Sequence, residues 1–161
     1  MGKTSSSPPR WASPTCAGSK ATTFTNGVIA TAKHFLGYGV SEGALNAAAS
    51  VASGRDLYDV CATPFEAMIK EAGLASVMNF YSDIDGVPAG ANRQILSDLL
   101  RGRMGFTGSV VSDYGTVEQL VTRQKIAATP QQAGILAPSC AARRPSFAAM
   151  NSQPSDPAPS C

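Results

Sequence analysis

The stretch that decides the fold is a short run of β-branched side chains that ends in a carboxylate and a glycine. It reads Gly108, Ser109, Val110, Val111, Ser112, Asp113, Tyr114 and Gly115. The stiff side chains of Val110 and Val111 predict a buried strand. Gly115 and Thr116 predict a turn and a helix start, which places Asp113 at the carboxyl end of the strand. In parallel α/β sheets such ends carry the chemistry, so Asp113 is a candidate functional residue and not only a turn cap.

Two apolar runs upstream predict further strands. Residues 28–32 read Val-Ile-Ala-Thr-Ala and come directly before the polar pair Lys33 and His34. Residues 74–81 form the second run, which ends at Tyr81 and is closed by an Asp-Gly turn signal. Neighbouring residues of a regular strand point to opposite faces, so Lys33 and His34 can share a site only where the backbone is irregular.

The first segment with helical spacing lies between these two runs. Thr63 followed by Pro64 and Glu66 has the pattern of a capping box with proline at the first helical position. We therefore expect a helix that begins at Thr63 and ends at Gly73, instead of one continuous helix through Pro64.

Two more helical segments flank the run that contains Asp113. Apolar side chains recur at helical spacing from Asn92 onwards, and Gly105 is the expected C-cap. Downstream, Thr116 and Gln119 predict a second capping box. The order strand, helix, strand, helix, strand, helix predicts an α/β fold of about three parallel βα units with right-handed crossovers.

Every predicted strand ends in a polar side chain. The first ends at Lys33 and His34, the second at Tyr81 and the third at Asp113. Successive parallel strands present their carboxyl ends at one edge of a sheet, so we expect these four residues to lie on one edge, around a single site.

Composition divides the chain into three parts. Residues 1–26 and 137–161 are rich in Ser, Pro, Ala and Thr, whereas nearly all large aliphatic residues lie between them. We expect residues 1–26 to be an unstructured leader, residues 27–136 to be the globular part, and residues 137–161 to be a disordered tail. Repeated Pro, Ser and Ala from Pro138 onwards should preclude a packed element.

Charge and cysteine usage narrow the classes of partner and cofactor. A formal net charge of +2 with 15% charged residues provides no basic stripe for nucleic acid. The four cysteines are widely spaced and accompany one histidine, which predicts neither a metal site nor a disulfide framework. No apolar signal core and no membrane-length apolar run is present, so the sequence predicts a soluble, cytoplasmic protein without a membrane partner.

A glycine-rich loop leaves a second interpretation open. Gly37, Gly39 and Gly43 follow the first predicted strand, as in a small nucleotide-binding α/β module. The third glycine of the usual fingerprint falls on Glu42, and the expected acidic residue falls in helical sequence, which disfavours that alternative.

Two long motifs resemble glycoside hydrolase family 3, in its N-terminal barrel domain of the β-glucosidase and β-xylosidase type. They are GVIATAKHFLGYG at residues 27–39 and TPFEAMIKEAGLASVMNFYSDIDGVPAGANRQILSDLLRGRMGFTGSVVSDYGTVEQL at residues 63–120. The resemblance covers roughly residues 27–136, and it implies a partial (β/α)8 barrel that acts on carbohydrate without a cofactor.

The resemblance also assigns roles to the strand-end residues. It implies that Asp113 is the nucleophile of a retaining β-glycosidase and that Lys33 and His34 hydrogen-bond the sugar hydroxyls. Tyr81 would shape the same subsite, and a lysine near the carboxylate would favour its ionised form. The loop reads KHFLGYG with no second histidine, which favours this branch over the one that acts on N-acetylhexosamines.

Several departures from the family imply an incomplete enzyme. About three of eight βα units are present, the acid/base carboxylate is expected outside this chain, and Gly54 stands where the family usually has Glu. The sequence therefore predicts an inactive truncated or frameshifted fragment of an active family, and a non-functional remnant is the remaining alternative.

Overall fold

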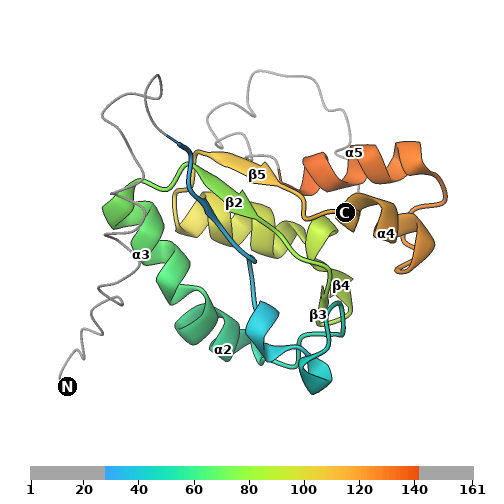
Figure 1. Cartoon of the computed structure of the whole chain (residues 1–161), viewed down its shortest axis with the longest axis horizontal. Coiled ribbons are helices and arrows are strands. Elements are labelled where there is room, and N and C mark those ends of the chain that lie inside the picture. Colours follow the sequence, from blue (N-terminus) through green and yellow to red (C-terminus); the bar gives the residue numbers. More distant parts are fainter. Residues whose placement is uncertain (1–27, 142–161) are drawn as a thin grey trace, which may run out of the picture.

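The computed structural model describes residues 28–141, and a three-stranded parallel sheet lies at their centre (Figure 1). The strands are β1 (Thr31–Ala32), β2 (Ser76–Met78) and β5 (Ser109–Val111), in the order β1-β2-β5. Thr31 lies opposite Ser76, and Ser76 lies opposite Ser109. All pairs are parallel, which confirms the predicted α/β arrangement.

Two helical crossovers connect the three strands. The chain from β1 to β2 passes through 3₁₀ turns η2 (Tyr38–Val40) and η3 (Glu42–Ala44), then α2 (Gly54–Asp56), the π-helical η4 (Leu57–Cys61) and α3 (Thr63–Ala72). The chain from β2 to β5 passes through β3 (Asp83–Ile84), β4 (Val87–Pro88), η5 (Ala89–Ala91) and the π-helical η6 (Gln94–Arg103). After β5 come α4 (Thr116–Thr122) and α5 (Pro130–Ala141), which lie side by side in Figure 1.

The outer strands are shorter and more exposed than the sequence predicts. Val28 and Ile29 are 69% and 57% exposed, and only two residues of β1 pair with β2. The strand at Val110 and Val111 is confirmed, but the expectation that it is buried is wrong, because β5 lies at the edge of the described sheet, Val110 is only half-buried and Val111 is 37% exposed. β-branched side chains indicate a strand but do not tell how many neighbours it has.

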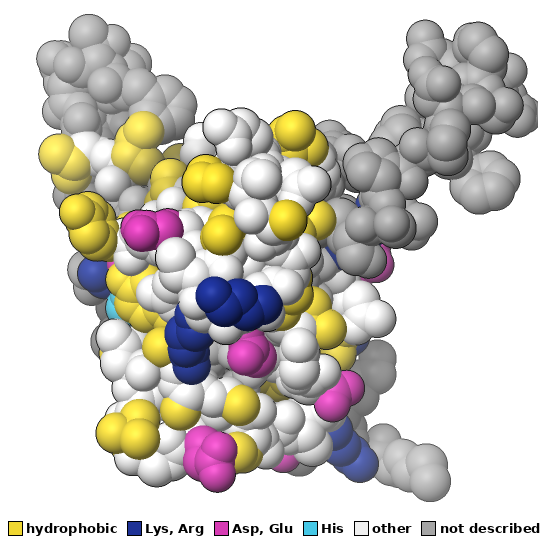
Figure 2. All heavy atoms as spheres, turned by 90° about the vertical axis from the view of Figure 1, so that its right-hand side faces the viewer, with side chains coloured by type: hydrophobic (Ala, Val, Ile, Leu, Met, Phe, Trp, Pro, Cys, Tyr) yellow, Lys and Arg dark blue, Asp and Glu magenta, His cyan; other side chains and the backbone are white. Residues whose placement is uncertain are grey.

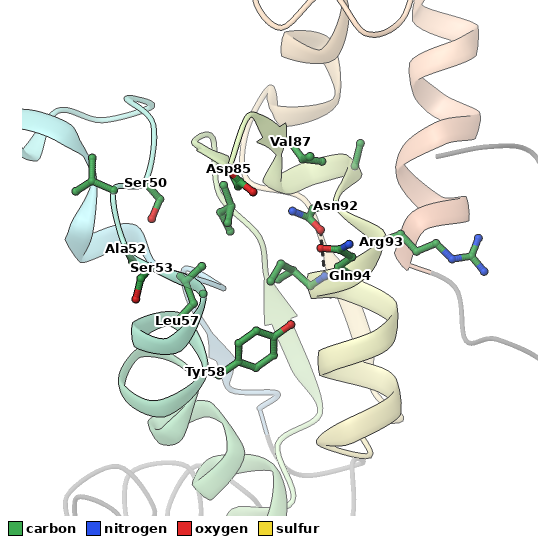
Figure 3. A pocket seen from close by; sticks show the side chains of 15 residues that line it. Ser50, Ala52, Ser53, Leu57, Tyr58, Asp85, Val87, Asn92, Arg93 and Gln94 are labelled. Atoms are coloured by element: carbon green, nitrogen blue, oxygen red, sulfur yellow. Dashed lines mark hydrogen bonds between the residues drawn. The ribbon is translucent and has the colours of Figure 1, made fainter.

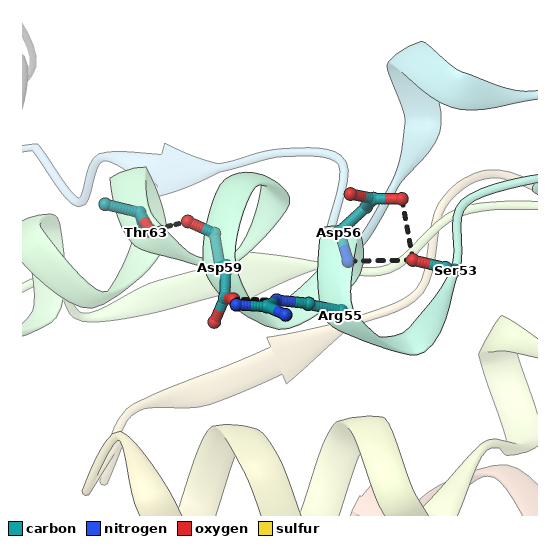
Figure 4. A network of polar contacts seen from close by, with 5 residues as sticks. All are labelled: Ser53, Arg55, Asp56, Asp59 and Thr63. Carbon is teal, nitrogen blue, oxygen red and sulfur yellow. Dashed lines mark hydrogen bonds and ion pairs between the residues drawn. The ribbon is translucent and has the colours of Figure 1, made fainter.

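The expected capping boxes at Thr63 and Thr116 are also wrong. Thr63 is already helical, and its hydroxyl donates to the Asp59 carbonyl oxygen at 2.8 Å, so the turn of η4 continues into α3 (Figure 4). Thr116 follows a left-handed Gly115 cap, and its buried hydroxyl has no partner among the described residues. The predicted ends at Gly73 and Gly105 are confirmed, since both glycines are left-handed with φ of 55° and 72°.

One buried cluster packs the helices against the sheet. Its fully buried side chains include Phe35, Leu36, Val77, Phe80, Leu96, Leu100 and Phe106. Arg101 joins three chain segments at the border of this cluster, because its guanidinium donates to the carbonyl oxygens of Gly108 at 2.7 Å and Ala141 at 2.9 Å. Gly108 itself lies so close to β2 that a Cβ there would be 2.2 Å from the Ala75 oxygen.

α5 was not predicted as a packed element. It begins after Thr129, whose hydroxyl accepts the Gln132 N–H at 3.2 Å, and its buried Ala133 and Ala137 pack in a second cluster with Leu120 of α4. The helix runs through Pro138 to Ala141, so the expectation that no packed element extends past Pro138 is wrong for residues 138–141. The leader, residues 1–26, and the tail beyond residue 141 lie outside the described residues.

The surface around α4 and α5 carries both signs of charge. Figure 2 shows Lys and Arg side chains interspersed with Asp and Glu on this face, among scattered hydrophobic groups. Within residues 28–141 no helix has the length and apolar character that a bilayer crossing needs.

Candidate active site

The carboxyl ends of the three parallel strands meet at one site. Nε2 of His34, two residues after β1, lies 3.1 Å from Oδ2 of Asp113, two residues after β5. Both side chains are largely buried, at 20% and 17% exposure. Tyr81, which follows β2, hydrogen-bonds the same carboxylate. The predicted meeting of these three residues at one sheet edge is confirmed.

Hydrogen bonds to backbone groups and to one side chain hold Asp113 in place. Its N–H donates to Oδ1 of buried Asn79 at 3.2 Å, and Asn79 directly follows β2. Its Oδ1 accepts the Tyr114 N–H at 2.7 Å, while the left-handed Gly115 lets the Thr116 N–H reach the Asp113 carbonyl oxygen at 3.1 Å. These contacts fix the carboxylate, and they leave Oδ2 turned toward His34.

Tyr81 supplies a neutral donor to the carboxylate. Burial is the largest cause that raises the pKa of its phenol, and the hydrogen bond and negative charge of Asp113 raise this pKa further. The backbone carbonyl oxygen of Tyr81 accepts Nε2 of Gln124 at 3.0 Å, which anchors the residue to the segment after α4. The phenol therefore stays protonated at neutral pH and can donate to Asp113.

Tyr38 covers the imidazole of His34 from the other side. The two rings stack with centroids 4.5 Å apart and planes 30° apart, and the edge of Tyr38 meets buried Phe80 at 6.3 Å. Gly37 sets this turn at φ 89°, where a Cβ would lie 2.9 Å from Leu57. Sequence reasoning missed both Tyr38 and Asn79. The signal for Tyr38 was its position between two glycines after a strand, and the signal for Asn79 was a polar residue within an apolar run.

Lys33 directly follows β1 and so lies at the same sheet edge as His34. It is exposed, and it borders an open cavity of about 350 Å³ together with His34 and Tyr38. The regular strand ends at Ala32, and the Lys33–His34 and Phe35–Leu36 peptide bonds are cis. Within residues 28–141 the basic side chain that contacts Asp113 is His34, and Lys33 forms no ion pair with a described residue.

The glycine loop does not form a phosphate cradle. Gly39 and Gly43 lie in 3₁₀ turns, Gly37 directly precedes the first of these turns, and the next helix, α2, begins only at Gly54. A dinucleotide site needs these glycines at the N-terminus of a long helix, so the nucleotide-binding alternative does not fit the geometry. Among residues 28–141 no three His, Cys, Asp or Glu side chains gather as a metal site.

Comparison with known proteins agrees with the geometry. A β-xylosidase of Formosa agariphila is 46% identical over 111 residues, which is 69% of this chain and 15% of that enzyme. The periplasmic β-glucosidase of Salmonella typhimurium is 33% identical over 66% of this chain and 14% of its own length. The solved structure of a β-glucosidase from Erythrobacter marinus superimposes with a TM-score of 0.73 and 34% identity, over 79% of this chain and 17% of that one.

The family match extends over most of the chain. The chain spans about one seventh of the length of the two curated relatives. The solved relatives have barrel N-terminal domains, and the parallel βα units described above form a partial version of that fold. Residues 6–136 match the family described as "Glycosyl hydrolase family 3 N terminal domain", a range that begins upstream of Gly27. On this match and these likenesses, the chain belongs to glycoside hydrolase family 3.

Proposed function

We propose that Asp113 is the nucleophile of a retaining β-glycosidase that releases terminal glucose or xylose residues. The observation that carries this proposal is the His34–Asp113 contact of 3.1 Å at the carboxyl edge of the parallel sheet, with Tyr81 on the same carboxylate. A fixed carboxylate at this edge, partly shielded from water, is the group that such a reaction requires.

The reaction follows from the groups around Asp113. Oδ2 attacks the anomeric carbon of a bound sugar, the bond to the leaving oxygen breaks, and a covalent glycosyl-enzyme forms, which water then hydrolyses. His34 and Lys33 face the adjoining space and would donate to the sugar hydroxyls. Tyr81 would shape the subsite and orient the carboxylate through its phenol.

Leaving-group protonation needs a second carboxylic acid. In retaining glycosidases the two carboxyl groups lie about 5–5.5 Å apart. The contacts of Asp113 within residues 28–141 include His34, Asn79, Tyr81 and Tyr114, and no second carboxylate. General acid catalysis contributes about 10²–10⁴-fold, so we propose that this chain alone turns over aryl glycosides negligibly.

A chimeric enzyme tests the role of Asp113 where the other parts are present. Residues 28–136 replace the matching segment of the Formosa agariphila β-xylosidase, which is 46% identical to this chain. Asp113→Asn in the chimera should lower kcat on aryl β-xyloside on the order of 10⁴-fold, because the attacking carboxylate is lost. The matched control Asp59→Asn removes an exposed carboxylate in a weak helical ion pair and should change kcat less than about twofold.

The outcome is read on three substrates in parallel, aryl β-xyloside, aryl β-glucoside and aryl N-acetyl-β-glucosaminide. Unchanged activity of the Asp113→Asn chimera would remove Asp113 from the mechanism. A folded but inactive chimera would contradict the proposal that this segment carries the nucleophile, and robust turnover by the 161-residue chain alone would show that it is not an incomplete enzyme.

A further inference from the structure

A larger cavity lies apart from the site of Asp113. It has a volume of about 630 Å³ and opens between the β3–β4 hairpin, the segment of Ser50 to Tyr58 and the start of η6 (Figure 3). None of His34, Tyr81 and Asp113 lines it. Its volume falls within the range of about 300–1,000 Å³ that small-molecule sites occupy.

Ser50 contributes a buried hydroxyl without a protein partner. The residue is only 9% exposed, and its Oγ makes no hydrogen bond to any described residue. Its backbone is fixed, because its N–H donates to the Asp83 carbonyl oxygen at 2.8 Å. Its Oγ is shielded from solvent, so Ser50 forms part of the cavity wall and its hydroxyl is not a contact for a ligand.

Asn92 and Asp85 add one donor and one acceptor. Asn92 is 4% exposed, and its Oδ1 accepts the Ile95 N–H at 3.1 Å, which leaves Nδ2 without a partner in the described part of the chain. Figure 3 shows this amide nitrogen and the Asp85 carboxylate turned toward the same space. Asp85 has no ion-pair partner among residues 28–141 and sits in the hairpin turn at φ 51°. A hydroxyl group donates to a carboxylate and accepts from an amide, so the pair suits a ligand with several hydroxyls.

The remaining lining excludes other classes of ligand. Asp85 and Arg93 are the charged residues of the lining, and the Arg93 side chain runs away from the cavity in Figure 3. An anion would therefore meet the Asp85 carboxylate without a compensating cation. The Ser53 hydroxyl is already bonded to the carboxylate and N–H of Asp56 (Figure 4), so it is not available to a ligand.

An apolar side of the cavity suits the carbon skeleton of a sugar. Leu57, Ile84 and Ile95 are buried at its base, and the ring of Tyr58 is 37% exposed beside them. Arg103 lies over that ring at 5.6 Å, which holds the ring in place. We propose that this cavity is a second carbohydrate site, which binds one neutral sugar residue through Asp85 and Asn92 without chemistry. This proposal does not rest on the role of Asp113.

Solution NMR of the isotope-labelled chain tests the proposal directly. D-xylose, D-glucose, xylotetraose and cellotetraose are titrated separately, and D-gluconate serves as the matched anionic polyol. We expect the amide signals of residues 50–58 and 84–95 to shift with a Kd of about 1–10 mM for a neutral monosaccharide, and gluconate to bind at least about tenfold more weakly. If a tetrasaccharide binds more tightly than its monosaccharide, the ligand of the cavity is the end of a glycan. If the two bind equally well, the ligand is the free sugar.

Three variants separate this cavity from the site of Asp113. Ser50→Ala should leave sugar binding unchanged and the melting temperature unchanged or higher, because it removes an unpaired hydroxyl that is shielded from the cavity. Asp85→Asn keeps the turn conformation, since Asn tolerates positive φ, and should weaken binding about tenfold. Asp113→Asn should leave the shifts at the cavity unchanged, whatever its effect on hydrolysis.

The control variant Asp59→Asn lies outside the cavity and should bind sugar like the parent chain. Shifts confined to residues around Asp113, an absence of shifts at residues 50–58 and 84–95, or full binding by Asp85→Asn would overturn the proposal.

Discussion

Among single residues, the groups that orient Asp113 matter most for its proposed role as nucleophile. His34 contacts this residue from the segment after β1, at 3.1 Å, and Asn79, at 3.2 Å, and Tyr81 contact it from the segment after β2. A nucleophile held from several sides loses little freedom on reaction, which is the benefit of preorganisation. Sequence reasoning identified Asp113, His34 and Tyr81 because each ends an apolar run. It missed Asn79, because an amide within such a run has no periodic signal.

The raised pKa of Tyr81 predicts how stability depends on pH. A phenol whose pKa is higher in the folded than in the unfolded chain stabilises the fold fully below about pH 10, and this contribution is lost as pH rises through the folded pKa. Urea unfolding from pH 8 to 11 should therefore show a fall in unfolding free energy above pH 10. Tyr81→Phe should show a smaller fall, and an identical fall in both proteins would disagree with the phenol–carboxylate contact.

The stack of Tyr38 on His34 predicts a spectroscopic signature. The chain has a single histidine, so its imidazole signals need no assignment. Nε2 of His34 faces Asp113, and we expect the spectrum of a tautomer with its proton on Nε2, with carbon-bound protons shifted upfield by the Tyr38 ring. Tyr38→Phe should keep both features, and Tyr38→Leu should lose the ring-current shift. In the chimera, Tyr38→Leu should lower kcat about 10- to 100-fold.

One result with the Tyr38 variants would contradict the role of Tyr38 in positioning His34. If Tyr38→Leu retained the upfield shift and full kcat, the stack would not position His34.

At the scale of elements, the helix starts show where local sequence patterns mislead. Thr63, Thr116 and Thr129 each precede an acidic or amide side chain by three residues, which is the capping pattern. Only the Thr129 hydroxyl accepts a backbone N–H three residues on, as that pattern requires. The other two starts are set by the preceding π turn and by the left-handed Gly115, both of which depend on tertiary packing.

Paired substitutions test this reading of the helix starts. Thr129→Ala should cost about 1 kcal/mol of unfolding free energy, because the N-terminus of α5 loses its cap. Thr116→Val should leave the unfolding free energy unchanged or raise it, since the buried Thr116 hydroxyl has no partner among the described residues. Urea denaturation of both variants at neutral pH measures these changes. A larger loss of unfolding free energy in Thr116→Val than in Thr129→Ala would contradict our assignment of the caps.

Strand lengths were the other feature that sequence could not predict. The Asp-Gly signal correctly marked a turn, since Asp85 and Gly86 both have positive φ between β3 and β4. By contrast, the apolar run at residues 28–32 predicted five strand residues, and only Thr31 and Ala32 pair. Side-chain type indicates a strand, but pairing depends on which neighbours the tertiary fold supplies.

At the scale of the whole molecule, parallel topology explains why the site could be predicted at all. Helical crossovers connect the parallel strands β1, β2 and β5, so residues more than thirty positions apart in sequence arrive at one sheet edge. The second cavity could not be foreseen in this way. It depends on how the β3–β4 hairpin packs beside η6, and neither element has a sequence pattern that specifies their spacing.

The most direct test of the central claim traps the covalent intermediate on Asp113. The chimeric enzyme is incubated with a dinitrophenyl 2-fluoro-β-xyloside, whose leaving group needs no protonation and whose fluorine slows hydrolysis of the glycosyl-enzyme. Mass spectrometry of the digested protein should then find one fluoroxylosyl group, on the peptide that contains Asp113. A label on a different carboxylate, or an active enzyme that acquires no label, would contradict the account.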